Sequence, residues 1–170
     1  MKNPNKNRVF RFNRRIRGQT DYNQRLRFLK SNMPRLVVRK SNKNMLVQIV
    51  QYASEGDKII TSSKSRDLSS FGFKINSGNI SAAYLTGYLV GKKALKKGFK
   101  EECIVDLGLA KVFSGSRLFA AVKGVVDAGI KVRVSDSVFP AEDRINGSHL
   151  KAKDSEKVIQ STKKAIEGMK

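Results

Sequence analysis

The sequence predicts an α/β protein: a mixed sheet made from a three-stranded antiparallel meander plus two βα crossover units, with a basic N-terminal arm and a C-terminal helix. Three β-rich runs joined by short connectors of turn-forming residues indicate the meander. Two segments with helical spacing of apolar residues, each followed by a further β-rich run, indicate the crossovers. The predicted order βββαβαβ therefore gives strands of mixed direction covered by helices.

Residues 1–19 are expected to form an extended or disordered arm, because they are polar and basic and show neither the helix nor the strand period. We expect this arm to precede an α/β body at residues 20–150, and the C-terminal helix to occupy residues 151–170. Three parts of unequal size are thus predicted.

A short helix is expected at the start of the body. The Thr20 hydroxyl is a candidate cap for a helix that begins near Asp21 and is ended by Pro34. Its apolar face comprises Tyr22, Leu26 and Leu29.

The meander is expected at residues 35–40 (RLVVRK), 45–52 (MLVQIVQY) and 58–63 (KIITSS). Their connectors, SNKN and ASEGD, are short and rich in turn formers, which favours antiparallel neighbours. Paired apolar residues such as VV and IV place hydrophobic groups on both faces, so the sequence leaves the register open.

The first crossover helix is expected at residues 80–98, with Asn79 as its N-cap and Gly98 as its stop. Lysines crowd its C-terminal end, where the helix dipole favours cations. A stripe of small residues predicts close packing of this helix on the sheet, since the apolar stretch is too short for a membrane dimer. The stripe comprises Ala83, Gly87, Gly91 and Ala94.

The remaining elements alternate in the same way. Residues 103–107 (CIVDL) are predicted to form a buried strand, residues 116–129 a second helix, and residues 131–135 (KVRVS) a fifth strand. The second helix buries Leu118, Ala121, Val122, Val125 and Val126. Residues 154–169 are predicted to form the C-terminal helix, with Val158, Ile159, Thr162 and Ile166 on its apolar face.

The charge of the chain indicates a polyanionic partner. Its 170 residues include 35 Lys or Arg and 14 Asp or Glu, a formal net charge of +21, and residues 1–40 alone carry +12. Self-repulsion of this size favours binding to a polyanion. We expect a cytoplasmic protein without a membrane partner, because no apolar run is long enough to cross a bilayer and the N-terminus lacks a signal-peptide core.

Catalytic signals are weak by comparison. Asp106 and Asp136 follow predicted strands and, as an alternative, are candidates to hold a divalent metal for a nuclease on a ribonuclease-H-like sheet. Residues 87–93 fail as a phosphate loop by length and because they lie in a helix. His149, the only histidine, suits a loop hydrogen bond or an RNA contact better than a metal site. We expect no enzyme activity, no metal and no cofactor.

Arginines dominate the binding signals. The stretch RVFRFNRRIRG, residues 8–18, contains Arg8, Arg11, Arg14, Arg15 and Arg17 and no acid. Guanidinium groups suit phosphate oxygens and stack on bases, whereas the simplest alternative is a solvated basic tail. The basic character continues into the meander through Arg25, Arg27, Arg35, Arg39, Lys40 and Lys43. A nucleic-acid partner is predicted, and the absence of helix-turn-helix and zinc patterns favours RNA.

Four blocks of this sequence resemble the universal large-subunit ribosomal protein family that binds 5S rRNA, numbered eighteen in the universal naming, in its archaeal form. The blocks are GQTDYNQRLRFLKSNMPRLVVRKSNKNMLVQIVQY (18–52), GNISAAYLTGYLVGKKALKKG (78–98), GSRLFAAVKGVVDAGIKV (115–132) and FPAEDRINGSHL (139–150). The stretch LAKVFSGSR (109–117) departs from the family by lacking an expected proline.

The resemblance implies a non-catalytic protein of the central protuberance that binds 5S rRNA and helps attach it to 23S rRNA. Its neighbours would include another 5S rRNA-binding ribosomal protein. A general RNA chaperone without a fixed target is a further alternative. The RNA-facing residues implied by the matched blocks are Arg14, Arg15, Arg17, Thr20, Tyr22, Arg25, Arg39, Ser41, Asn42, Lys43, Asn44, Arg144 and His149.

Overall fold

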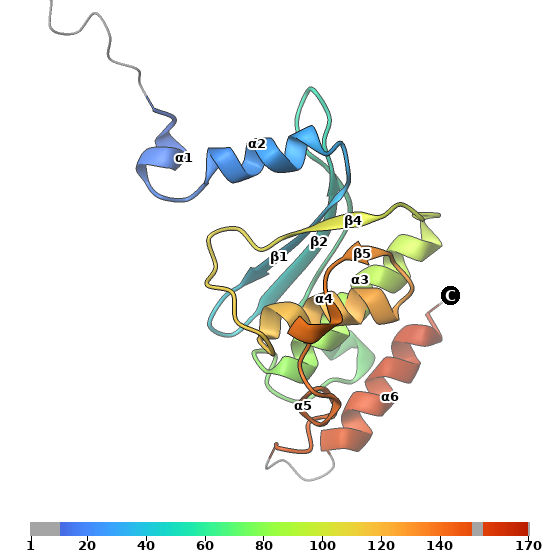
Figure 1. Ribbon diagram of the computed structural model, residues 1–170. Helices are drawn as coiled ribbons and strands as arrows, with labels where there is room; N and C mark the ends of the chain where they lie inside the picture. The colour runs from blue at the N-terminus through green and yellow to red at the C-terminus, as the bar shows by residue number, and fades with distance from the viewer. Residues whose placement is uncertain (1–10, 151–154, 170) are drawn as a thin grey trace, which may run out of the picture.

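The computed structural model describes residues 11–150 and 155–169, and it confirms an α/β fold built on a five-stranded mixed sheet (Figure 1). The strand order is β3-β2-β1-β4-β5, with the meander antiparallel and the last two strands parallel to β1. The strands are β1 (Arg35–Lys40), β2 (Met45–Gln51), β3 (Lys58–Lys64), β4 (Cys103–Asp106) and β5 (Val132–Arg133).

Pairing between β1 and β2 fixes which side chains face the core. Leu36 lies opposite Ile49 and Val38 opposite Val47, and all four are fully buried. The alternate residues of β1, which begin at Arg35, therefore point to the other face of the sheet. This register, which the sequence left open, gives the sheet one apolar face and one face rich in arginine.

Two long helices, α3 (Ile80–Lys96) and α4 (Arg117–Asp127), cover the apolar face (Figure 1). The helix α3 begins where the Asn79 side chain accepts the amide of Ala82 at 2.6 Å, and the chain turns at Gly98 with a φ of +76°. The helix α4, which was predicted at residues 116–129, lies beside it. Short elements that the sequence did not predict are α1 (Asn13–Ile16), η1 (Ser65–Phe71), η2 (Asp136–Val138) and α5 (Glu142–Asn146).

The N-terminal segment differs from its prediction in two respects. Residues 13–16 form one helical turn instead of extended chain, while residues 1–10, including Arg8, lie outside the described part of the structure. The helix α2 (Tyr22–Lys30) is capped by Asp21, whose carboxylate accepts the amides of Asn23 and Gln24, because an anion suits the positive helix N-terminus. The predicted Thr20 cap is wrong.

Two further expectations need correction. Leu26, which was assigned to the apolar face of α2, is 53% exposed, because α2 reaches beyond the edge of the sheet (Figure 1). The fifth strand is two residues long instead of five, since only Cys103 and Ile104 lie opposite Val132 and Arg133.

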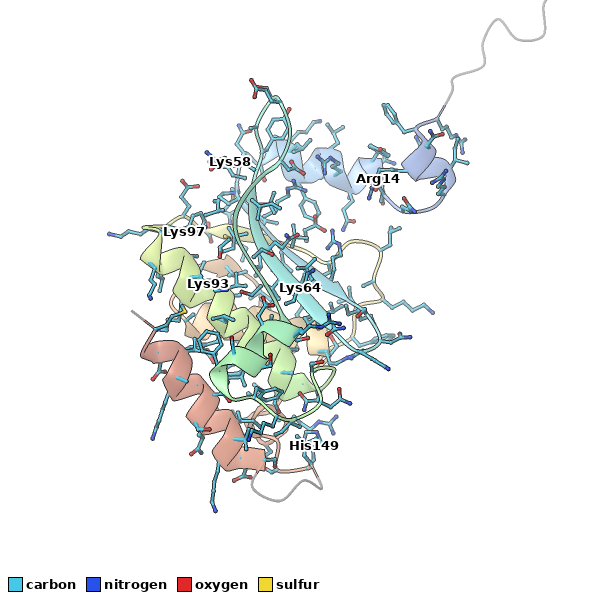
Figure 2. The ribbon with its side chains drawn as sticks, turned by 180° about the vertical axis from the view of Figure 1, so that it is seen from behind. Arg14, Lys58, Lys64, Lys93, Lys97 and His149 are labelled. Carbon is cyan, nitrogen blue, oxygen red and sulfur yellow. The ribbon has the colours of Figure 1, made fainter. Side chains whose placement is uncertain are left out.

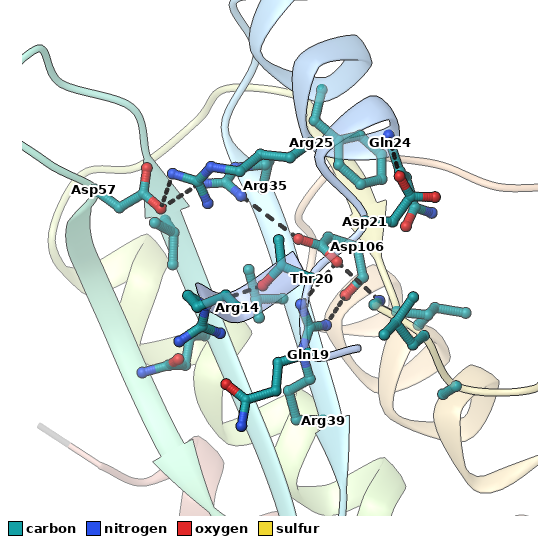
Figure 3. A pocket seen from close by; sticks show the side chains of 18 of the residues that line it. Arg14, Gln19, Thr20, Asp21, Gln24, Arg25, Arg35, Arg39, Asp57 and Asp106 are labelled. Carbon is teal, nitrogen blue, oxygen red and sulfur yellow. Dashed lines mark hydrogen bonds and ion pairs between the residues drawn. The ribbon is translucent and has the colours of Figure 1, made fainter. Parts of the chain in front are cut away.

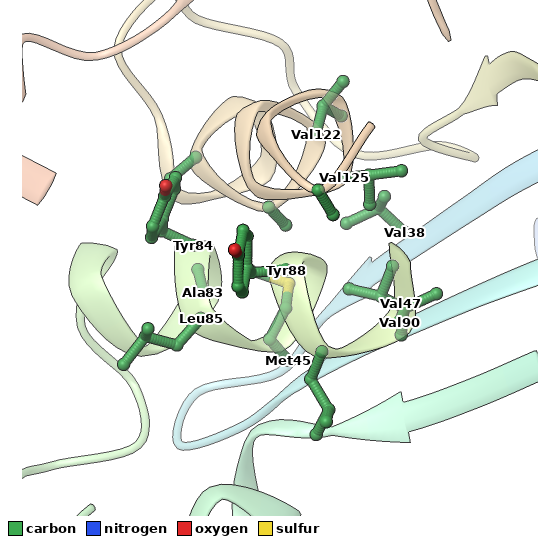
Figure 4. Close-up of a cluster of buried hydrophobic side chains, with 14 of the residues drawn as sticks. Val38, Met45, Val47, Ala83, Tyr84, Leu85, Tyr88, Val90, Val122 and Val125 are labelled. Carbon is green, nitrogen blue, oxygen red and sulfur yellow. The ribbon is translucent and has the colours of Figure 1, made fainter. Parts of the chain in front are cut away.

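The core lies between the sheet and the two helices (Figure 4). Val38 and Val47 of the sheet, Leu85 of α3 and Val122 of α4 are fully buried. Burial raises the pKa of the Cys103 thiol to about 12, so this residue stays protonated at neutral pH and acts as a small apolar side chain.

The small-residue stripe of α3 packs against α4 instead of the sheet. A Cβ atom added to Gly87 would lie 1.9 Å from the carbonyl oxygen of Ala121, and one added to Gly124 of α4 would lie 2.1 Å from that of Tyr84. Gly87 and Gly124 thus allow the two helix backbones to touch. The stripe was correctly read as close packing, but its partner was wrong.

Gly87→Ala is expected to lower the free energy of unfolding by about 3 kcal/mol or more, because the new methyl group forces two packed helices apart. Urea denaturation followed by circular dichroism measures the change. Gly168→Ala is the matched control, since its Cβ would meet its nearest neighbour at an ordinary 3.6 Å. Equal stability of the two variants would contradict the close helix contact.

The C-terminal helix α6 (Ser155–Glu167) docks on α3 through two tyrosines, and Ile159, Thr162 and Ile166 of its predicted face are buried. Tyr88 donates a hydrogen bond to Glu167 of α6 at 2.6 Å, and Lys163 of α6 donates one to the Tyr84 hydroxyl at 3.2 Å. Tyr84 itself donates to Asp127 of α4 at 2.9 Å. Burial, together with these carboxylates, raises the pKa of both phenols well above the usual value.

Candidate nucleic-acid interface

The face of the sheet that no helix of the core covers forms a polar groove of about 590 Å³ (Figure 3). Its floor is built from β1, β2 and β4, and one wall is formed by residues 14–28, which cross above the strands. Five of the predicted RNA-facing residues come together here. They are Arg14, Thr20, Arg25, Arg35 and Arg39.

Ion pairs link the arginines of this groove in a chain (Figure 3). Asp57 lies 3.0 Å from Arg25 and 2.7 Å from Arg35, the second contact being an ion pair without hydrogen-bond geometry. Asp106 lies 3.5 Å from Arg35 and 2.8 Å from Arg39. Two carboxylates therefore hold three guanidinium groups side by side, leaving excess positive charge.

The Asp57 carboxyl responds directly to these arginines. Its partial burial alone would raise the pKa, but the guanidinium groups of Arg35 and Arg25 outweigh burial and hold the pKa below its usual value. Because the folded-state pKa is the lower one, Asp57 stabilises the fold above about pH 4 and loses this contribution as the pH falls through the folded value.

Arg39 is fixed by more than its ion pair. Its guanidinium also donates to the carbonyl oxygens of Asp106 at 2.6 Å and Val38 at 3.0 Å. Gly108, at a φ of +63°, lies so close that an added Cβ would be 3.0 Å from the Arg39 Cζ atom. Arg39 nevertheless keeps 42% of its side chain exposed, so it presents a rigidly held cation to the solvent.

The turn between β1 and β2 is the second part of the interface. Ser41 and Asn44 close it by three mutual hydrogen bonds of 2.8–3.0 Å. Ser77 donates to the Lys43 carbonyl at 2.8 Å, and Arg117 of α4 donates to the carbonyl of Gly78 at 2.6 Å beside the turn. The Asn42 and Lys43 side chains stay exposed on this anchored backbone.

A basic pocket of about 360 Å³ lies between this turn and the start of η1. Lys64 and Arg66 line it together with Arg39, Lys40 and Ser41. Lys64 and Arg66 were not among the predicted RNA-binding residues, although their charge is visible in the sequence. Arg117 was not predicted either. Its role in holding the turn depends on contacts with residues 39 and 75 positions away, which its charge alone does not indicate.

The N-terminal residues extend the basic surface beyond the groove. Arg11, Arg15, Arg17 and Arg27 are exposed, and Arg14 donates from Nε to the Thr20 hydroxyl at 3.0 Å. Phe12 and Tyr22 pack with their ring centroids 5.0 Å apart, which ties α1 to α2. Phe12 remains 69% exposed.

Three predicted contact residues are placed differently. Arg35 is only 4% exposed and is occupied by Asp57 and Asp106, so it organises the groove from within. Arg144 and His149 are exposed, but His149 lies at the opposite end of the molecule from Arg14 (Figure 2). These two residues therefore do not belong to the groove.

Asp106, one of the two candidate ligands for a catalytic metal, is paired with the arginines of the groove. Within residues 11–150 and 155–169, no group of three His, Cys, Asp or Glu side chains is placed to hold a metal ion. Nothing in this geometry resembles the converging carboxylates of a two-metal nuclease. In the same described ranges, no helix combines the length and the hydrophobicity needed to cross a membrane.

The fold and this interface define a class of protein, a basic α/β protein with a preorganised arginine face. Comparison with known families is more specific: the family described as "Ribosomal large subunit proteins 60S L5, and 50S L18" matches residues 6–102. The chain belongs to this family. It is a structural, non-enzymatic constituent of the large ribosomal subunit, in the cytoplasm, as the sequence predicted.

Curated relatives agree with this assignment, and each is called "Large ribosomal subunit protein uL18". The protein of Methanococcoides burtonii is 46% identical over 139 residues, covering 82% of this chain and 80% of its own. The Korarchaeum cryptofilum protein is 46% identical, covering 82% and 71%, and the Methanobrevibacter smithii protein is 45% identical, covering 82% and 72%. The archaeal form of the predicted family is confirmed.

Proposed function

We propose that this chain binds 5S rRNA through the groove, the β1–β2 turn and the N-terminal arginines, and helps attach it to 23S rRNA in the central protuberance. The observation that carries the proposal is the chain of arginines held side by side on the open sheet face. Membership of the ribosomal family supplies the RNA context.

The groove supports backbone recognition because its cations are fixed before RNA arrives. Arg39 is held by three contacts to neighbouring oxygens, and the turn that carries Lys43 is held by Ser77 and by Arg117 of α4. Ordering long side chains in advance reduces the entropy lost on binding. The half-buried amides of Gln24 and Gln48, which line the groove, add hydrogen-bonding groups for riboses or base edges.

Partners beyond 5S rRNA belong to the same proposal. Attachment to 23S rRNA and contact with another 5S rRNA-binding ribosomal protein require surfaces outside the groove. The exposed side chains of Arg144 in α5 and of His149, which lies at the far end of the molecule from Arg14, are candidates for such contacts.

Competition between RNAs tests the proposal. Labelled 5S rRNA is bound to the purified chain, and unlabelled 5S rRNA or an unrelated RNA of equal length is added as competitor. We expect 5S rRNA to compete far more effectively. Equal competition would instead identify a general RNA chaperone, and absence of any 5S rRNA complex at low salt would refute RNA binding altogether.

Removal of residues 1–17 is expected to weaken 5S rRNA binding while leaving the body folded, because these residues carry exposed arginines but contribute no buried side chain among residues 11–17. Filter binding measures the affinity, and circular dichroism measures the fold. Arg11→Gln/Arg15→Gln/Arg17→Gln in the full-length chain is the companion variant. Unfolding of the truncated chain would show that the segment is part of the body.

A further inference from the structure

A second basic surface, made of lysines, lies at the sheet edge formed by β3, on the side covered by α3. It consists of Lys58 of β3 with Lys93, Lys96 and Lys97 at the end of α3 and its C-cap, and we call it the edge face. In the view opposite to that of Figure 1, Lys58, Lys93 and Lys97 lie on one side of the molecule and Arg14 lies on the other (Figure 2). The edge face is therefore separate from the N-terminal arginines.

The charge of this surface is not compensated. Residues 58–64 and 91–100 together contain seven lysines and no acid. Lys93 donates to the Ser63 hydroxyl at 2.8 Å, and Lys97 donates to the Ile60 carbonyl at 2.5 Å. Both acceptors are neutral, and in the described part of the chain none of the ion pairs within 4 Å involves a lysine of the edge face.

Ordinary structural roles explain only part of this arrangement. Lysines protect exposed edge strands from pairing with other chains, and cations are favourable at helix C-termini. Neither role requires Lys93 and Lys97 to reach from α3 onto β3. These two contacts place both ammonium groups on β3, at Ser63 and Ile60, in the strand that begins with Lys58.

Lysine-rich surfaces of this kind suit phosphates better than proteins. Lysine is depleted in protein–protein interfaces, where aromatic side chains and arginine are enriched. A phosphate backbone, in contrast, is bound by lysines as point charges without a demand for shape. The edge face presents lysines and no exposed aromatic side chain of β3 or α3.

We infer that the edge face binds the phosphate backbone of a second RNA helix, so that the chain bridges two RNA segments. This inference rests on the proposed function and assigns its second RNA contact to particular residues. Binding is expected to be independent of base sequence, because the four lysines reach phosphates only.

The test measures two affinities on one variant. Lys93→Gln/Lys96→Gln/Lys97→Gln is prepared in the full chain, with Lys111→Gln/Lys131→Gln/Lys164→Gln as a control of equal charge change on other elements. Each protein is first saturated with 5S rRNA, and the complex is then titrated with 23S rRNA and followed by sedimentation. The edge-face variant should keep its 5S rRNA affinity but lose affinity for 23S rRNA.

The salt dependence of 23S rRNA binding gives the expected size of the effect. Its log–log slope should fall by about 0.9 for each phosphate-bound lysine removed, or about 2.7 in total. An unchanged slope, an equal loss in the control, or an equal loss of 5S rRNA affinity would each overturn the inference. Aggregation of the variant would overturn the inference and show that the lysines protect the β3 edge from pairing with other chains. Failure of the unmodified chain to bind 5S rRNA would instead refute the proposed function.

Discussion

Raising the monovalent salt from about 50 mM to about 200 mM is expected to lower the affinity for 5S rRNA by about three to five decades, if about 6 to 10 phosphates are contacted. The physical reason is counterion release, because each phosphate neutralised by a cation frees condensed ions whose entropy gain shrinks as salt is added. A chain with a formal net charge of +21 and exposed arginines at residues 11, 14, 15 and 17 has enough cations for this number.

Single substitutions measure how much each arginine contributes to this salt dependence. Arg15→Gln or Arg17→Gln should each lower the log–log slope by about 0.9, because each removes one exposed cation. Arg133→Gln is the control, since Arg133 is paired with Glu102 at 3.0 Å in β5, away from the groove. An affinity for 5S rRNA that barely changes with salt would contradict phosphate binding. If Arg133→Gln lowered the slope as much as Arg15→Gln or Arg17→Gln, phosphate binding could not be assigned to the surface that carries Arg15 and Arg17.

Local signals were sufficient to predict most of the fold. Apolar spacing located α3 and α4, Asn79 and Gly98 marked the ends of the first of these helices, and the turn formers separated β1, β2 and β3. These features depend on neighbours within one or two turns of the chain. The prediction of Thr20 as the cap failed because Thr and Asp both suit an N-cap, and the backbone geometry places Asp21 there.

Features that depend on long-range contacts could not be predicted from the sequence. A stripe of small residues indicates a close neighbour without naming it, so Gly87 was assigned to the sheet when its partner is Ala121 of α4. The arginines of β1 gave a charge signal, but their partners Asp57 and Asp106 come from other strands and turns. Sequence therefore located the basic surface and did not separate Arg35, which supports it, from Arg39, which is exposed.

Asp106→Asn is expected to lower the free energy of unfolding by about 3 kcal/mol, because removal of one partner of a buried ion pair leaves the other charge uncompensated. Arg35 and Asp106 are 4% and 6% exposed, and Arg39 loses its ion pair in the same variant. Urea denaturation measures the change. Glu55→Gln, an exposed carboxylate in the β2–β3 connection, is the matched control and should stay within about 0.5 kcal/mol of the unmodified chain.

The same variant separates a supporting role for Arg35 from direct RNA contact. If Asp106 and Asp57 hold Arg35 as part of the groove, Arg35→Gln and Asp106→Asn break the same network. The double variant should then lose less stability than the sum of the losses in the two single variants. Additive effects would mean that the buried pair contributes little to folding. Arg35 would then be left without a structural reason for its burial, and its positive charge would have to be assigned to RNA.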